Sequence, residues 1–186
     1  MVNREFGGVD EEGWLPGARR VDSPHCDARP EGCAVSLLVV HNISLPPGQF
    51  GGPGVEQLFT NRLNPEEHPY YAEIQGLRVS AHFFIRRKGE LIQFVPCSRR
   101  AWHAGVSNWQ GRAGCNDFSI GVELEGTDDA PYDDIQYAVL NQLLDALRTA
   151  YPITSVVGHS DIAPERKTDP GPCFDWGRLS VTPGRR

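Results

Sequence analysis

The residues best suited to chemistry lie in two segments that are far apart in the chain. Near the C-terminus, residues 158–172 (GHSDIAPERKTDPGP) place a histidine, a lysine and several carboxylates in a loop that follows an apolar stretch. Far upstream, the apolar run 36–40 ends in His41 and Asn42. Two histidines at strand ends and one carboxylate are the ligand set of a catalytic zinc that keeps an open fourth position.

The third ligand of such a metal site has three candidates. His41 and His159 would supply neutral imidazole nitrogens, and the carboxylate would come from the loop that follows His159. Asp161, Glu165 and Asp169 all lie in this loop. Asp169 precedes a proline, which favours an extended backbone there. Spacing alone leaves the choice among the three open.

Hydrolysis of an amide at this site would also need a base and a group that stabilises an oxyanion. Glu123 lies in an apolar stretch and is a candidate to accept the proton of the attacking water, although Glu125 on the same strand face competes for this role. Lys167 would point the same way as Asp169 if the loop between them is extended. Its ammonium group could then stabilise negative charge on the substrate oxygen.

A sheet must position these side chains, and the apolar patterns predict one. The run 35–41 is almost continuously apolar, which is typical of a central strand that is covered on both faces. A glycine-containing connection between two apolar stretches indicates a hairpin. We predict strands over residues 35–41, 80–86, 91–95, 118–124 and 153–157, and helices over residues 55–63 and 133–150. This order predicts an α/β (α+β) fold with a central mixed sheet of about five strands flanked by helices.

The chain of 186 residues is expected to form one domain, residues 1–186. Residues 1–34 are rich in proline and glycine and predict an irregular N-terminal segment that packs on this domain. The segment 45–78 is also rich in turn residues, and we interpret it as a lid over the cleft, because long loops of this kind are often functional.

Composition excludes several classes of partner. The net charge of −6 argues against nucleic acid, because phosphate binding requires a basic surface. No apolar span is long enough to cross a membrane, and the first residues lack the pattern of a signal peptide. The five cysteines are an odd number without a CxxC pair, which fits reduced thiols. We therefore expect a cytoplasmic protein, and we expect it to be a monomer.

Five segments of the chain together resemble a known family. They are VVHNIS at 39–44, RVSAHFFIRRKGELIQFVP at 78–96, AWHAGVSNWQGR at 101–112, CNDFSIGVELEGTD at 115–128 and GHSDIAPERKTDPGPCFDW at 158–176. They are similar to motifs of the amidase_2 group of cell-wall amidases, which is related in fold to T7-type lysozymes and peptidoglycan recognition proteins. The similarity spans nearly the whole chain, and the motifs occur in the order that the family requires.

The resemblance implies roles that spacing could not assign. It selects Asp169 over the other loop carboxylates and Glu123 over Glu125. It implies one zinc ion per chain and a small muropeptide substrate. The implied zinc ligands are His41, His159 and Asp169, the implied catalytic groups are Glu123 and Lys167, and the implied substrate contacts are Asn42 and Arg78 for the stem peptide and Trp102 for the anhydro-sugar.

The function that the resemblance implies is hydrolysis of the amide between the lactyl group of 1,6-anhydro-N-acetylmuramic acid and the L-alanine of the stem peptide, during recycling of the cell wall. One alternative is a secreted lytic peptidoglycan amidase, which the missing signal sequence disfavours. Another is a non-catalytic peptidoglycan-binding module. Such modules can dispense with metal ligands, whereas this sequence has all three together with both catalytic candidates.

Overall fold

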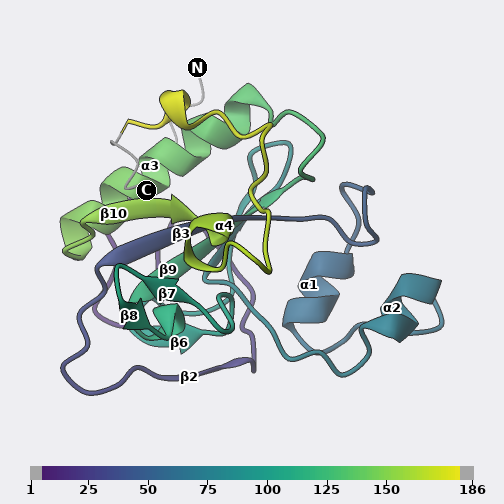
Figure 1. The fold of residues 1–186 in the computed structure, drawn as a ribbon, viewed down its shortest axis with the longest axis horizontal. Coiled ribbons are helices and arrows are strands. Elements are labelled where there is room, and N and C mark those ends of the chain that lie inside the picture. The colour runs from purple at the N-terminus through teal and green to yellow at the C-terminus, as the bar shows by residue number, and fades with distance from the viewer. Residues whose placement is uncertain (1–5, 181–186) are drawn as a thin grey trace.

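The computed structural model describes residues 6–180, and a mixed six-stranded sheet forms its centre (Figure 1). The strand order is β1-β5-β4-β9-β3-β10. β4, β9, β3 and β10 are parallel to one another, β5 is antiparallel to β4, and β1 is parallel to β5. The strands of this sheet are β1 (Arg19–Arg20), β3 (Leu37–Ile43), β4 (Phe83–Ile85), β5 (Leu91–Gln93), β9 (Ser119–Glu125) and β10 (Ser155–Gly158).

The predicted fold class is confirmed, with one more strand in the sheet than expected. The additional strand is β1, which pairs with β5 at one edge of the sheet. β2 (Cys26–Ala28) pairs with β6 (Arg99–Ala101) in a separate two-stranded sheet. The prediction of an irregular N-terminal segment is therefore wrong at these two places, because short strands of mostly polar residues carry no apolar pattern. Residues 1–5 of that segment lie outside the described residues.

Helix α3 (Asp134–Ala150) covers one face of the sheet (Figure 1). It begins after Asp133, whose side chain forms a capping box with Gln136. The apolar side of α3, including Leu140 and Leu143, belongs to the same buried cluster as Val40 and Val122 of the two central strands. The predicted helix over 133–150 is thus confirmed. Close packing on this face leaves the opposite face of the sheet to carry the site.

The opposite face is covered by two separate apolar clusters. One cluster joins Leu37 and Val39 of β3 to the loop region 104–118. The other joins Phe84 of β4 and Ile92 of β5 to the segment that contains the first two helices. The smaller elements that build this side are α1 (Gly54–Phe59), α2 (Pro69–Glu73), β7 (Asn108–Trp109), β8 (Arg112–Ala113), η1 (Cys115–Asp117), α4 (His159–Ile162) and η2 (Trp176–Arg178).

The segment 45–78 is a packed wall of the molecule. The predicted helix over 55–63 is present as the shorter α1, while α2 was not predicted. Val55, Leu58, Phe59 and Tyr71 are all buried against the sheet. The role of this segment as a moving lid stays a prediction. Within residues 6–180, no helix combines the length and apolar character needed to cross a membrane.

Candidate active site

The register of three parallel strands places three polar residues side by side. His41 of β3 is paired with Glu123 of β9. Gly158, the last residue of β10, is paired with Val40, so His159 follows directly beside His41. Paired residues on neighbouring strands point to the same face. The sheet therefore presents a row of two imidazoles and one carboxylate on the face opposite α3.

The positions of both histidines in the secondary structure differ slightly from the prediction that each ends a strand. β3 continues for two residues beyond His41 because its pairing with β9 extends to Ile43. His159 is the first residue of α4 rather than the last residue of β10. The chain turns immediately after β10, and this turn brings the following loop back over the row.

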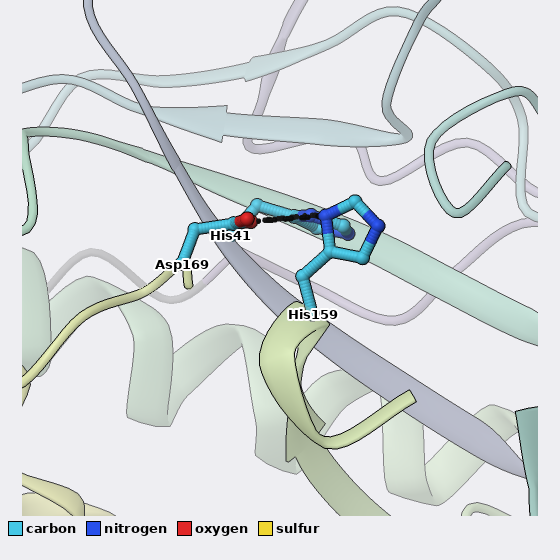
Figure 2. A group of neighbouring side chains, drawn as sticks. All are labelled: His41, His159 and Asp169. Carbon is cyan, nitrogen blue, oxygen red and sulfur yellow. Dashed lines mark hydrogen bonds and ion pairs between the residues drawn. The ribbon is translucent and has the colours of Figure 1, made fainter. Parts of the chain in front are cut away.

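Three candidate ligand atoms meet above this row (Figure 2). Nδ1 of His41 lies 3.0 Å from Nδ1 of His159 and 3.0 Å from Oδ2 of Asp169. Nδ1 of His159 lies 3.1 Å from the same carboxylate oxygen. Both imidazoles are buried and Asp169 is half-buried. Residues 6–180 contain no other such group of histidine, cysteine and carboxylate side chains, so this is the place where the described chain can hold a metal ion.

The structure separates the three loop carboxylates that spacing could not distinguish. Oδ2 of Asp161 accepts a hydrogen bond from the backbone N–H of Gly158 at 2.7 Å and so serves the start of α4. Glu165 is exposed and does not line the cleft. Asp169 alone joins the two histidines, and the backbone N–H of Ser160 donates to its carbonyl at 3.0 Å.

The electrostatics of the cluster suit a cation. Burial lowers the pKa of His41 to about 4, and the neighbouring His159 imidazole acts in the same direction. Burial acts to raise the pKa of Asp169, but its contacts with the protonated forms of His159 and His41 outweigh this and hold the pKa below its ordinary value. At neutral pH the group therefore contains a neutral His41 imidazole and an ionised carboxylate, which are the forms that bind metals.

Glu123 is buried in the centre of the sheet, with 8% of its surface exposed. Its Oε2 atom has no hydrogen-bond partner among the described residues, which is rare for a buried polar atom and leaves this oxygen free to act on a ligand. Burial, and secondly the charge of Asp169, raise the pKa of Glu123 well above its ordinary value, while Lys167 acts to lower it. Glu123 is not a solvated carboxylate on an edge strand, because β9 is a central strand of the sheet.

A cleft of about 620 Å³ opens above these groups. Its polar end contains Glu123, the three candidate ligands and half-buried Lys167. The walls beyond are largely apolar and include Ile43, Leu45, Leu58, Phe59, Tyr70, Ile74 and Val79. The cleft can thus hold a substrate that has both a reactive polar bond and an apolar surface.

The three predicted substrate contacts are placed differently from one another. Asn42 lines the cleft, and its Nδ2 donates to Oδ1 of Asp128 at 2.7 Å and to the carbonyl of Pro170 at 3.2 Å. Trp102 is half-buried, lines the cleft and stacks against His25. Arg78 is exposed, and the structure does not bring it into the cleft wall, although both of its neighbours in the chain line it.

One buried residue at the site could not be predicted from the sequence. His103 lies in the cleft wall, and its Nδ1 is 2.9 Å from Nε2 of His41. Its segment, AWHAGVSNWQGR, was singled out, but no apolar pattern assigned this histidine to a strand end. The position of His103 depends on loop geometry, which the spacing of residues does not encode.

Comparison with known proteins identifies the family to which this chain belongs. The Amidase_2 family, described as N-acetylmuramoyl-L-alanine amidase, matches residues 31–172. The chain belongs to this family.

Individual relatives are similar over most of the chain. The 1,6-anhydro-N-acetylmuramyl-L-alanine amidase AmpD of Escherichia coli (strain K12) is 61% identical over 173 residues, which cover 92% of this chain and 94% of AmpD. The crystal structure of a selenomethionine AmpD derivative matches with a TM-score of 0.89 and 62% identity, covering 91% of this chain and 96% of that chain. The amidase AmiD from E. coli, solved in complex with anhydro-N-acetylmuramic acid-L-Ala-D-γ-Glu-L-Lys, matches with a TM-score of 0.57 and 30% identity, covering 92% of this chain and 63% of that chain.

Proposed function

We propose that this protein is a zinc-dependent amidase that hydrolyses the amide between the lactyl group of 1,6-anhydro-N-acetylmuramic acid and the L-alanine of the stem peptide. The observation that carries the proposal is the convergence of His41, His159 and Asp169 beside buried Glu123, whose Oε2 has no hydrogen-bond partner. The fold shared with AmpD, and the substrate in the names of AmpD and of the AmiD complex, support the choice of bond.

The three candidate ligands fit a zinc ion. Nitrogen and oxygen ligands lie about 2.0 Å from a tetrahedral zinc, so they lie about 3.3 Å from one another. The observed separations of 3.0 to 3.1 Å are close to this value. Two histidines and one carboxylate leave a fourth position open, as in catalytic zinc sites. When bound, zinc would lower the pKa of a water that it holds and polarise the scissile carbonyl.

Glu123 is the proposed proton carrier of the reaction. It lies beside His41 on the neighbouring strand and faces the cleft. Its carboxylate would accept the proton of the attacking water and then deliver this proton to the leaving amine of L-alanine. A raised pKa favours the first half of this transfer, because a carboxylate of higher pKa is a stronger base than an ordinary one in solution.

Lys167 is the proposed stabiliser of the developing negative charge. It lines the same end of the cleft as Asp169, and its charge acts on both Glu123 and His41. A positive side chain held beside the scissile carbonyl stabilises the oxyanion more than the ground-state amide. Lys167 would therefore lower the barrier rather than tighten substrate binding.

The apolar part of the cleft is the proposed site for the rest of the substrate. Trp102 offers a flat aromatic surface, which suits the apolar face of the anhydro-sugar. Asn42 lies close to the loop of Asp169 and is proposed to meet the stem peptide. Arg78 is proposed to pair with the peptide carboxylate from the rim of the cleft, where its exposed side chain can reach a bound ligand.

The proposal is tested by incubating the purified protein with anhydro-muramyl tripeptide, with and without a chelator, and by supplying intact peptidoglycan in parallel. The expected result is release of free tripeptide that the chelator abolishes and zinc restores, with little action on the intact polymer. Preferred action on the polymer would favour the lytic amidase. Binding of the muropeptide without any release would favour the non-catalytic module.

We further propose that the protein acts in the cytoplasm, as a monomer, in the recycling of cell-wall fragments. All five cysteines are free, which fits a reducing compartment. Light scattering of the purified protein tests the monomer. Fractionation of cells tests the location, and accumulation of anhydro-muropeptides after deletion of the gene tests the recycling role.

A further inference from the structure

We propose that His103 and the backbone carbonyl of Ala104 are positioning groups that fix the tautomers of both histidine ligands, so that each ligand presents an unprotonated Nδ1 to the metal. This inference rests on the proposed metal-dependent function. It assigns a role to two consecutive residues that take no part in the chemistry described above. It follows from the direction in which each hydrogen bond at the site must run.

The direction is fixed at the far end of a chain of hydrogen bonds behind His41. The carbonyl of Cys115 can only accept, so the hydroxyl of Ser119 must donate to it at 2.5 Å. Nε2 of His103 lies 3.1 Å from Oγ of Ser119 and must therefore donate to this oxygen. In a neutral imidazole, Nδ1 is then an acceptor.

The next hydrogen bond in this chain joins His103 to the candidate metal ligand His41. Nδ1 of His103 is 2.9 Å from Nε2 of His41, so Nε2 of His41 must donate its proton to it. A neutral His41 with its proton on Nε2 has a free electron pair on Nδ1. This is the atom that faces His159 and Asp169. The relay from Cys115 to His41 thus sets the protonation state of the ligand atom.

His159 is set by the neighbouring residue of the same loop. Its Nε2 lies 3.2 Å from the carbonyl oxygen of Ala104. Because a carbonyl only accepts, Nε2 of His159 carries the proton and Nδ1 does not. One dipeptide, His103 and Ala104, therefore orients both imidazoles, one through a side chain and the other through the backbone.

This dipeptide is itself held firmly. Oδ1 of Asn116 accepts from the backbone N–H groups of both His103 and Ala104, at 3.1 and 2.8 Å. Nη2 of Arg166 donates to the carbonyl of Ala104 at 2.8 Å. The ring of His103 also packs directly on Gly121, where an added Cβ would lie 2.4 Å from Cγ of His103. Glycine at 121 leaves the space that the relay requires.

The consequence is a site prepared for a cation. Three electron-pair donors face one another at 3.0 to 3.1 Å, and the relay places no hydrogen between them. If the relay were broken, His41 could shift its proton to Nδ1 and donate it to Asp169, and a metal would then have to displace that proton. Groups that orient metal-binding histidines in this way typically change metal affinity about 10- to 100-fold.

The experiment records ¹⁵N imidazole spectra of the metal-free protein and measures zinc affinity by competition with a chromophoric chelator. In the native protein, His41 and His159 should both be Nε2–H tautomers. His103→Ala should give His41 a Nδ1–H population and weaken zinc binding about 10- to 100-fold. His103→Asn keeps an acceptor at the position of Nδ1 and should restore most of the affinity. An Asn variant as weak as the Ala variant would overturn the proposal.

A matched pair of serine variants tests the relay without touching the histidine. Ser119→Ala removes the acceptor for Nε2 of His103, whereas Ser23→Ala removes another buried hydroxyl that donates to a backbone carbonyl at 2.5 Å but lies outside the cleft. The first should disturb the His41 tautomer and the second should not, and this comparison stands even if His103→Ala fails to fold. Native His41 as a Nδ1–H tautomer, or zinc affinity within twofold in both Ser119→Ala and His103→Ala, would overturn the proposal. Correct tautomers in a native protein that binds no zinc would instead refute the proposed function.

Discussion

Two regions of the same strand show how this fold separates a structural carboxylate from a reactive one. Glu123 and Glu125 lie two residues apart on β9, face the same side of the sheet and are both buried. The carboxylate of Glu125 accepts backbone hydrogen bonds from Gly51 at 2.5 Å and from Arg87 at 2.9 Å. Oε2 of Glu123 has no such partner, and Glu123 lines the cleft.

The strand therefore buries both side chains, and the surrounding loops decide which of them stays available for chemistry. A buried carboxylate oxygen without a partner is costly, so it persists where its free electron pairs serve a purpose. Around Glu125, the loop that includes Gly51 and the hairpin that includes Arg87 close over the side chain. Around Glu123, the loop that carries Lys167 and Asp169 leaves the cleft open.

Replacement of each carboxylate by its amide should change turnover to very different extents, and this is the largest expected contrast. Glu123→Gln should lower kcat on anhydro-muramyl tripeptide about 10²- to 10⁴-fold, because the proton carrier is lost. Glu125→Gln should change kcat only a few-fold, because that side chain does not reach the cleft. Rates at saturating substrate, with zinc content measured in both variants, provide the test. Comparable losses in the two variants would contradict the division.

Replacement of the cation near each carboxylate should likewise affect kcat in one case and stability in the other. Lys167→Met should lower kcat about 10²- to 10³-fold with a smaller change in KM, because its charge acts on the transition state. Arg86→Met removes the cation that lies 3.9 Å from Glu125 and 2.6 Å from Glu56. It should lower stability while leaving kcat nearly unchanged. Kinetics and denaturant unfolding of both variants measure these effects. A large loss of kcat in Arg86→Met, together with a nearly unchanged kcat in Lys167→Met, would contradict the prediction.

The effects of the two replacements on stability should be ordered in the reverse of their effects on kcat. Glu125→Gln should lower the free energy of unfolding by about 1–3 kcal/mol, because an amide NH₂ group would then face a backbone N–H donor. Glu123→Gln in the metal-free protein should cause no loss, since the native carboxylate has an oxygen without a partner. Urea unfolding of the two metal-free variants measures both values. A larger loss for Glu123→Gln would show that this side chain has a structural role.

The smallest expected effect is a pH dependence that belongs to Glu123 alone. Its pKa in the folded protein is raised above the ordinary 4.5. From that pH upward, the folded state binds more protons than the unfolded state, so this residue lowers stability as the pH rises toward its folded pKa. The stability advantage of metal-free Glu123→Gln over the native protein should therefore grow above about pH 4.5. Urea unfolding from pH 5 to 8 would show a constant difference if the pKa were ordinary.

The buried elements that have a periodic apolar pattern could be predicted from the sequence. β3, β9 and α3 have continuous or helical apolar patterns, and each lies within two residues of its predicted bounds. The candidate ligands His41 and His159 could be proposed because they follow such runs. Where the strands pair, the register then places Glu123 beside His41, which spacing could not reveal.

The remaining features depend on loops, where no period exists. The choice between Asp161 and Asp169 required knowledge that Asp161 bonds to the backbone of Gly158. The role of His103 depends on a turn held by Asn116. The edge strand β1 consists of two arginines and has no apolar pattern at all. Resemblance to a family supplied the ligand choice, but it did not supply the contacts that explain it.

A calorimetric zinc titration of the metal-free protein asks whether His41, His159 and Asp169 hold one zinc ion. We expect one zinc per chain for the native protein and for Glu123→Gln, and loss of this site in His159→Ala. Folding of the last variant is checked by circular dichroism. A native protein without a tight zinc site, or a folded His159→Ala variant with native affinity, would contradict the account.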